Sequence, residues 1–135
     1  CSWVHPSQEK VLFSSTHEDP EAKAKMAAEI EQRQSGQRRA YAWDYDEFYD
    51  IYEADFNGEN IKNLTNIKGY DAEASWSPDD KLIAFASNRR AYSEPLSEQE
   101  AALFKQTPST LIDIYIMNAS GAVSRKMGTK PRYSP

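Results

Sequence analysis

The sequence has a single cysteine, Cys1, and only five glycines among its 135 residues. One cysteine excludes an intramolecular disulfide and a metal site built from several cysteines. The glycines are isolated, so the glycine-rich loops that cradle phosphates are absent, as are His-Glu-x-x-His and Gly-x-Ser-x-Gly motifs. No apolar run approaches the roughly 18–20 residues that cross a bilayer. We therefore expect no catalysis by this segment, no bound cofactor and no membrane insertion.

Basic residues are too few to give the chain a positive field. There are 16 lysines and arginines against 21 aspartates and glutamates, which gives a formal net charge of −5. This balance argues against tight binding to nucleic acid. With 39% hydrophobic and 27% charged residues, the composition is typical of a folded globular protein. The 12% aromatic content favours a β-rich fold.

The chain contains an internal repeat of two kinds of segment, which alternate. Residues 1–17 match residues 73–89, and residues 49–65 match residues 112–128. The aligned pairs are Pro6 with Pro78, Phe13 with Phe85, Ser15 with Ser87, Ile51 with Ile114, Tyr52 with Tyr115, and Gly58 with Gly121. Each repeat thus contains one segment of each kind.

Both kinds of segment have the pattern of a β-hairpin. Val11, Phe13 and Ser15 alternate with their neighbours, as expected for an extended strand with two different faces. Asn57-Gly58 and Ser120-Gly121 lie between β-like runs and supply the positive φ of short hairpin loops. Two hairpins per repeat predict one four-stranded antiparallel sheet.

The repeats are uneven because each carries an insertion, at about residues 18–46 and 90–110. In the first, Asp19 as N-cap and Pro20 as first helical residue predict a helix that ends near Ser35. In the second, Ser97 and Glu100 form a capping box. Both insertions fall between the second and third strands of a repeat, so we expect them on the same side of the sheets. We expect Met26 and Ile30 to dock the first helix onto its own sheet.

The string that runs from Asn57-Gly58 to Ser87-Asn88-Arg89, with its Ser-Trp-Ser-Pro-Asp segment, resembles the TolB-type β-propeller repeat, a relative of the WD-type blade. The resemblance implies an all-β fold of two four-stranded antiparallel propeller blades plus the start of a third, with two short helical insertions. The expected divisions are a first blade at 1–66, a second blade at 67–130, and the first strand of a third at 131–135. Two blades cannot close a ring, so we expect a fragment of a longer propeller, or self-association through the open blade faces.

The resemblance also implies a role and a location. Such propellers are commonly exported, so a periplasmic or otherwise exported protein is expected. The expected function is a non-catalytic scaffold that binds a protein or peptide partner. The alternative is an accessory propeller domain that gates or positions substrate for a larger peptidase or hydrolase, whose catalytic residues would lie outside this segment.

The candidate binding residues lie mainly on the insertion side of the expected sheets. Aromatic side chains contribute most to protein interfaces, and acidic groups at the rim discriminate between partners. For Asp71 and Glu73, which connect the two repeats, a position at a channel rim competes with a structural role in a tight turn. The binding candidates are Trp43, Tyr45, Asp46, Tyr92, Asp71 and Glu73.

A metal site is not expected, although one acidic stretch has the ligand type that a hard cation prefers. Asp44, Asp46 and Glu47 are the weak candidates, and they lack the ligand spacing of a known loop site. His5 and His17 have too few neighbouring ligands to form a zinc site, so structural or solvated roles are favoured.

Overall fold

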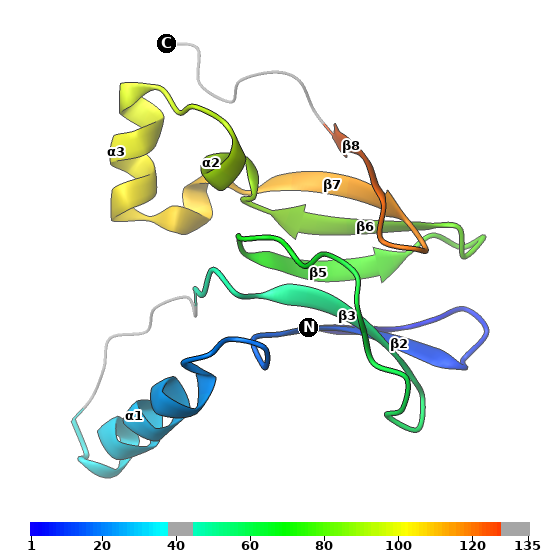
Figure 1. The fold of residues 1–135 in the computed structure, drawn as a ribbon, viewed down its shortest axis with the longest axis horizontal. Coiled ribbons are helices and arrows are strands. Elements are labelled where there is room, and N and C mark those ends of the chain that lie inside the picture. Colours follow the sequence, from blue (N-terminus) through cyan, green and yellow to red (C-terminus); the bar gives the residue numbers. More distant parts are fainter. Residues whose placement is uncertain (38–44, 128–135) are drawn as a thin grey trace.

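The computed structural model describes residues 1–37 and 45–127, which form two antiparallel sheets and several helices (Figure 1). In each sheet the strand order follows the chain: β1-β2-β3-β4 in the first sheet and β5-β6-β7-β8 in the second. The strands are β1 (Ser2–Val4), β2 (Lys10–Ser15), β3 (Asp50–Asp55), β4 (Lys62–Asn63), β5 (Asp71–Trp76), β6 (Leu82–Ser87), β7 (Asp113–Asn118) and β8 (Val123–Met127). The helices are α1 (Ala22–Gln34), α2 (Arg90–Ser93), α3 (Glu98–Gln106) and the 3-10 turn η1 (Pro108–Leu111).

The prediction of an all-β propeller fold is wrong. The fold is mixed, because α1 has 13 residues and α3 has 9, and the described residues show no arrangement of propeller blades. The expected first strand of a third blade, 131–135, lies outside the described residues. The all-β class was implied by the resemblance to a propeller repeat, and the two helical insertions were given too little weight in it. These insertions join β2 to β3 and β6 to β7, and each is long enough to form regular helix.

The repeat itself is visible in the turns of the first hairpin of each sheet. Pro6 and Pro78 both follow the first strand of their sheet. Two residues later, Gln8 and Asp80 adopt the left-handed backbone conformation, with φ of 62° and 57°. A residue in this conformation lets the chain reverse tightly between two antiparallel strands. The predicted equivalence of these two turns is confirmed.

The second hairpins place glycine where the sequence predicts a positive φ. Gly58 and Gly121 have φ of 85° and 92°. At Gly121 a second reason applies, since a Cβ atom there would lie 2.5 Å from the carbonyl oxygen of Leu64. The absence of a side chain therefore lets the β7–β8 turn of the second sheet contact the first sheet directly.

The helices lie at one end of the sheets, with α1 and α3 on the same side in Figure 1, as predicted. The capping box of α3 is confirmed: the Ser97 hydroxyl accepts from the Glu100 N–H, and the Glu100 carboxylate accepts from the Ser97 N–H. The hydrogen bond from the Ser97 N–H, followed by that from the Arg90 side chain, lowers the pKa of Glu100 to about 2. No helix in the described part of the chain has the length and apolarity of a membrane-spanning segment.

Helix α1 departs from the prediction at its start and along its face. It begins at Ala22, and Asp19 is not its N-cap. The Asp19 carboxylate accepts from the Glu21 N–H and pairs with Lys25 across 2.7 Å. The expected docking of α1 on its sheet is also wrong, since none of its residues is buried. Polar contacts at its first turn, rather than apolar packing, hold this helix.

The core lies between the two sheets. Strand β5 packs on β1, β2 and β3, so one face of the first sheet is covered by the second (Figure 1). The first sheet contributes three aliphatic side chains, and the second sheet contributes mainly aromatic and sulfur-containing ones. The buried cluster contains Leu12, Ile51, Leu64, Ala74, Trp76, Ile83, Phe85, Tyr115 and Met117.

The repeat supplies a matched pair of variants that tests this core. Ile51 is fully buried, whereas its repeat equivalent Ile114 is 45% exposed. We expect Ile51→Ala to lower the free energy of unfolding by about 2–5 kcal/mol, because it leaves a cavity between the sheets. Ile114→Ala should cost less than about 1 kcal/mol. Urea denaturation at low protein concentration measures both; equal losses would contradict the core described above.

Candidate functional site: a tyrosine cluster between the insertions

Three segments that are distant in sequence meet at the end of the sheets that carries the helices. They are residues 45–49 before β3, residues 68–70 before β5, and the α2–α3 insertion. Backbone hydrogen bonds join the first two: the Gly69 N–H donates to the Glu47 carbonyl at 3.0 Å, and the Asp71 N–H donates to the Tyr49 carbonyl at 2.8 Å. The positions of the side chains on these segments are therefore fixed relative to one another.

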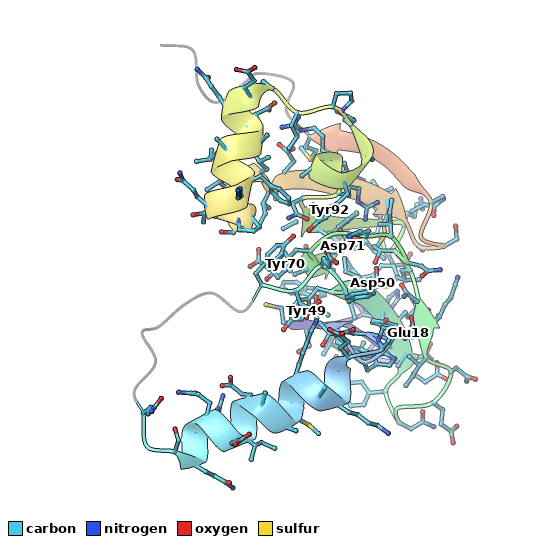
Figure 2. The ribbon with its side chains drawn as sticks, turned by 60° about the vertical axis from the view of Figure 1, so that its left-hand side comes forward. Glu18, Tyr49, Asp50, Tyr70, Asp71 and Tyr92 are labelled. Atoms are coloured by element: carbon cyan, nitrogen blue, oxygen red, sulfur yellow. The ribbon has the colours of Figure 1, made fainter. Side chains whose placement is uncertain are left out.

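Four tyrosines from these segments form one cluster, hereafter the tyrosine cluster: Tyr45, Tyr49, Tyr70 and Tyr92. Tyr45 stacks on Tyr70 with ring centroids 5.9 Å apart, and Tyr49 meets Tyr70 edge-on at 5.2 Å. The hydroxyls of Tyr45 and Tyr92 share a hydrogen bond. Figure 2 shows Tyr49, Tyr70 and Tyr92 between α1 and α3, beside the sheet ends. All but Tyr70 are partly exposed.

Asn88, which follows β6 directly, anchors the cluster. Its side chain is fully buried. The amide oxygen accepts from the Tyr70 N–H at 2.8 Å, and the amide nitrogen donates to the Tyr45 hydroxyl at 2.8 Å and to the Pro108 carbonyl at 3.4 Å. Gly69 permits this approach, since a Cβ there would lie 3.1 Å from the amide oxygen of Asn88. One buried amide thus holds both insertions and the β4–β5 connection in place.

The charged groups around the tyrosine cluster are paired. Lys68 lies 5.2 Å from the centroid of the Tyr92 ring and 3.1 Å from the Glu47 carboxylate. Arg90 donates to Glu100 at 2.7 Å. Burial raises the pKa of the Tyr92 hydroxyl, and the hydrogen bond with Tyr45 raises it further. The cluster is therefore an aromatic surface with neutral hydroxyls and locally balanced charge.

A buried ion pair supports the cluster from beneath. Asp71 is fully buried, and its carboxylate accepts from the Arg89 guanidinium at 2.7 Å. That guanidinium lies over the rings of Phe85 and Tyr115, 4.8 and 5.2 Å from their centroids. Burial raises the pKa of Asp71 to about 6, although the charge of Arg89 opposes the shift. Asp71 therefore serves the junction between the sheets and is not available to a ligand at the surface.

A second polar cluster lies on the first sheet, where Asn63 bridges two acidic groups. The Asn63 amide nitrogen donates to Glu18 and to Asp50, at 3.0 Å each. Tyr52 also donates to Glu18 at 3.0 Å, and these hydrogen bonds lower the pKa of the Glu18 carboxyl. Asp50 receives a further hydrogen bond from the Thr65 hydroxyl at 2.6 Å. The hydrogen bonds among these side chains tie the end of β4 to β3.

The structure brings together only some of the predicted binding residues. Tyr45 and Tyr92 are in direct contact, as described. Asp46 lies on the same segment as Tyr45, but its carboxylate pairs with Lys25 at 2.6 Å and accepts from the Phe48 N–H. Glu73 is exposed at a bulge in β5, where its φ is 59°. Trp43 lies outside the described residues.

Sequence reasoning missed the residues that organise the cluster. Tyr49 is the first residue of a repeated segment and Tyr70 lies in a predicted connection, while Asn88 and Arg89 follow a strand at positions where the first repeat has Thr16 and His17. The difference between the repeats at Asn88 and Arg89 was the signal that could have identified these two residues. A position that differs between repeats serves something other than the shared scaffold. Tyr70 had no comparable signal.

The weak metal candidates have other partners. Asp46 pairs with Lys25 and Glu47 with Lys68, while Asp44 lies outside the described residues. Within 1–37 and 45–127, no group of three or more His, Cys, Asp and Glu side chains could hold a metal ion. His5 and His17 each contact a serine two residues away, at 2.8 and 2.9 Å. Both contacts are local and involve the Nδ1 atom of each imidazole.

Comparison with known proteins found no matching protein-family model, no matching curated protein and no matching solved structure.

The buried carboxyl gives a pH-dependent prediction. The folded-state pKa of Asp71, about 6, lies above the ordinary value of 3.8, so between these values the folded chain holds this proton and the unfolded chain does not. The contribution to stability is complete below the lower value and is lost as the pH rises through the higher one. Relative to Asp71→Asn, we expect wild type to lose about 2 kcal/mol between pH 4 and pH 7.

Urea denaturation of both proteins across this range measures the difference. Asp79→Asn is the matched control, because a hydrogen bond from Ser77 lowers the pKa of this exposed carboxyl and its contribution has the opposite sign. If the stability of wild type relative to Asp71→Asn stays constant or increases with pH, the assignment is contradicted.

Proposed function

We propose that this chain is a non-catalytic recognition module that binds a peptide segment of a partner protein at the tyrosine cluster. The observation that carries the proposal is the hydrogen-bonded pair Tyr45–Tyr92, which joins the two insertions across the sheet ends. Both side chains are partly exposed, and Asn88 fixes Tyr45 from below.

Tyrosine suits this role for physical reasons. Its ring offers a large apolar area with few rotatable bonds, so little conformational entropy is lost on binding. Here stacking and buried hydrogen bonds already restrict the rings in the free protein. A partner would meet a preorganised surface, and the cost of ordering the site would be small.

The surroundings of the cluster favour a peptide with an apolar or aromatic anchor. Phe48 in the first segment and Leu103 in the α2–α3 insertion are exposed large apolar side chains, and so is Ile67, directly before residues 68–70. The nearby lysines and arginine are paired with carboxylates, so no net charge is offered to a strongly ionic ligand. Hydrophobic anchors surrounded by polar groups are the usual anatomy of a protein interface.

Selection from a displayed peptide library on the immobilised full chain, followed by calorimetry with the selected peptides, tests the proposal. We expect Tyr92→Ala and Tyr45→Ala to weaken binding at least about tenfold, as is usual for a central aromatic contact. Phe56→Ala is the matched control, because Phe56 is an exposed aromatic residue in the β3–β4 hairpin.

The control should bind the selected peptides as wild type does, and thermal melting should show that all three variants remain folded. Peptides that bind Tyr92→Ala and Tyr45→Ala with undiminished affinity would overturn the proposal. So would equal losses in the Phe56→Ala variant, since they would locate binding elsewhere.

A further inference from the structure

The contact between the two sheets is built from two different faces. The first sheet contributes the face with Leu12, Ile51 and Leu64, all of which are buried. The second sheet contributes the face that is equivalent, in the repeat, to the outer face of the first sheet. Its side chains in the core include Trp76, Ile83, Phe85, Tyr115 and Met117. The two sheets therefore pack head to tail, aliphatic face against aromatic face.

The second sheet has its own aliphatic face, and this face is open. In the repeat, Ile114 is the equivalent of Ile51, and Met127 is the equivalent of Leu64. In the first sheet, Ile51 and Leu64 are buried. In the second sheet, Ile114 and Met127 are 45% and 49% exposed. Ile114 pairs with Met127 in the β7–β8 register, so the two lie side by side on one face. Exposed Leu82 extends this face along β6.

The first sheet leaves part of the complementary face open, although Tyr52 and Ala54, the repeat equivalents of Tyr115 and Met117, are already buried on it. Val4, Val11 and Phe13 are the repeat equivalents of Trp76, Ile83 and Phe85, which make up the covering face inside the molecule. Val4 is 47% exposed, and it pairs with Val11 in the β1–β2 register. Phe13 stacks on Tyr52, as Phe85 stacks on Tyr115. The chain thus presents the aliphatic face of its second sheet and the Val4–Val11 part of the outer face of its first sheet, which correspond to the two sides of its internal interface.

We propose that a second copy of this chain docks on these faces, with the outer face of its first sheet on the outer face of the second sheet of its neighbour. The contact continues the internal interface between the sheets. Because the two faces differ, the contact is heterologous. In a pair, one copy keeps the open face of its first sheet and the other copy keeps the open face of its second sheet. Exposed apolar patches of this kind mark association surfaces. This inference is independent of the tyrosine cluster, which lies at the sheet ends.

Two exposed positions provide the test. Ile114→Glu places a charge on the open face of the second sheet, and Val4→Glu places one on the open face of the first. By sedimentation velocity, the average mass of wild type should rise with concentration, while each variant alone should remain a monomer. An equimolar mixture of the two variants should form a one-to-one dimer and nothing larger, since each supplies the face that the other lacks.

Met26→Glu, at an exposed position of α1, is the control and should associate as wild type does. Circular dichroism melting confirms that the variants are folded, as expected for substitutions at exposed sites. A wild type that stays monomeric at its highest soluble concentration would overturn the proposal. Association of Val4→Glu alone would also overturn it, because it would reveal a symmetric contact. So would a mixture of the two variants that remains monomeric.

Discussion

The structure depends on the burial of one aliphatic face beneath one aromatic face. Leu12, Ile51 and Leu64 are buried in the core between the sheets, and a small antiparallel sheet with one open face has little independent stability. The other features described here follow from this contact. It sets the sheet ends beside each other, and this brings residues 45–49 and 68–70 within hydrogen-bonding distance.

Much of the local structure could be predicted because it obeys short-range rules. Asn57-Gly58 and Ser120-Gly121 are turn sequences, and Ser97 with Glu100 is a capping box; each acts through its own backbone. The fold class could not be predicted in this way. The pattern of strands said nothing about how many residues the insertions would fold into helix, or about the arrangement of the sheets beyond the pair.

The candidate site was predictable only in part, for a related reason. Tyr45 and Tyr92 could be chosen as aromatic residues of the insertions, but Tyr45 is held by Asn88, which is 43 residues away in the sequence and belongs to the second repeat. Asp71 was expected at a rim or in a turn and is instead buried with Arg89. Long-range partners of polar groups have no periodic signature, so a single sequence cannot reveal them.

The two left-handed residues in the first hairpin turns have a consequence for the evolution of this chain. Gln8 and Asp80 each hold a conformation that glycine adopts freely and that side chains disfavour by roughly 1 kcal/mol. Aspartate tolerates it better than glutamine, so the strain is greater in the N-terminal turn. A change of either codon to one for glycine would remove this strain. Because both positions are at the surface, the thermal stability could rise without disturbing any packed side chain.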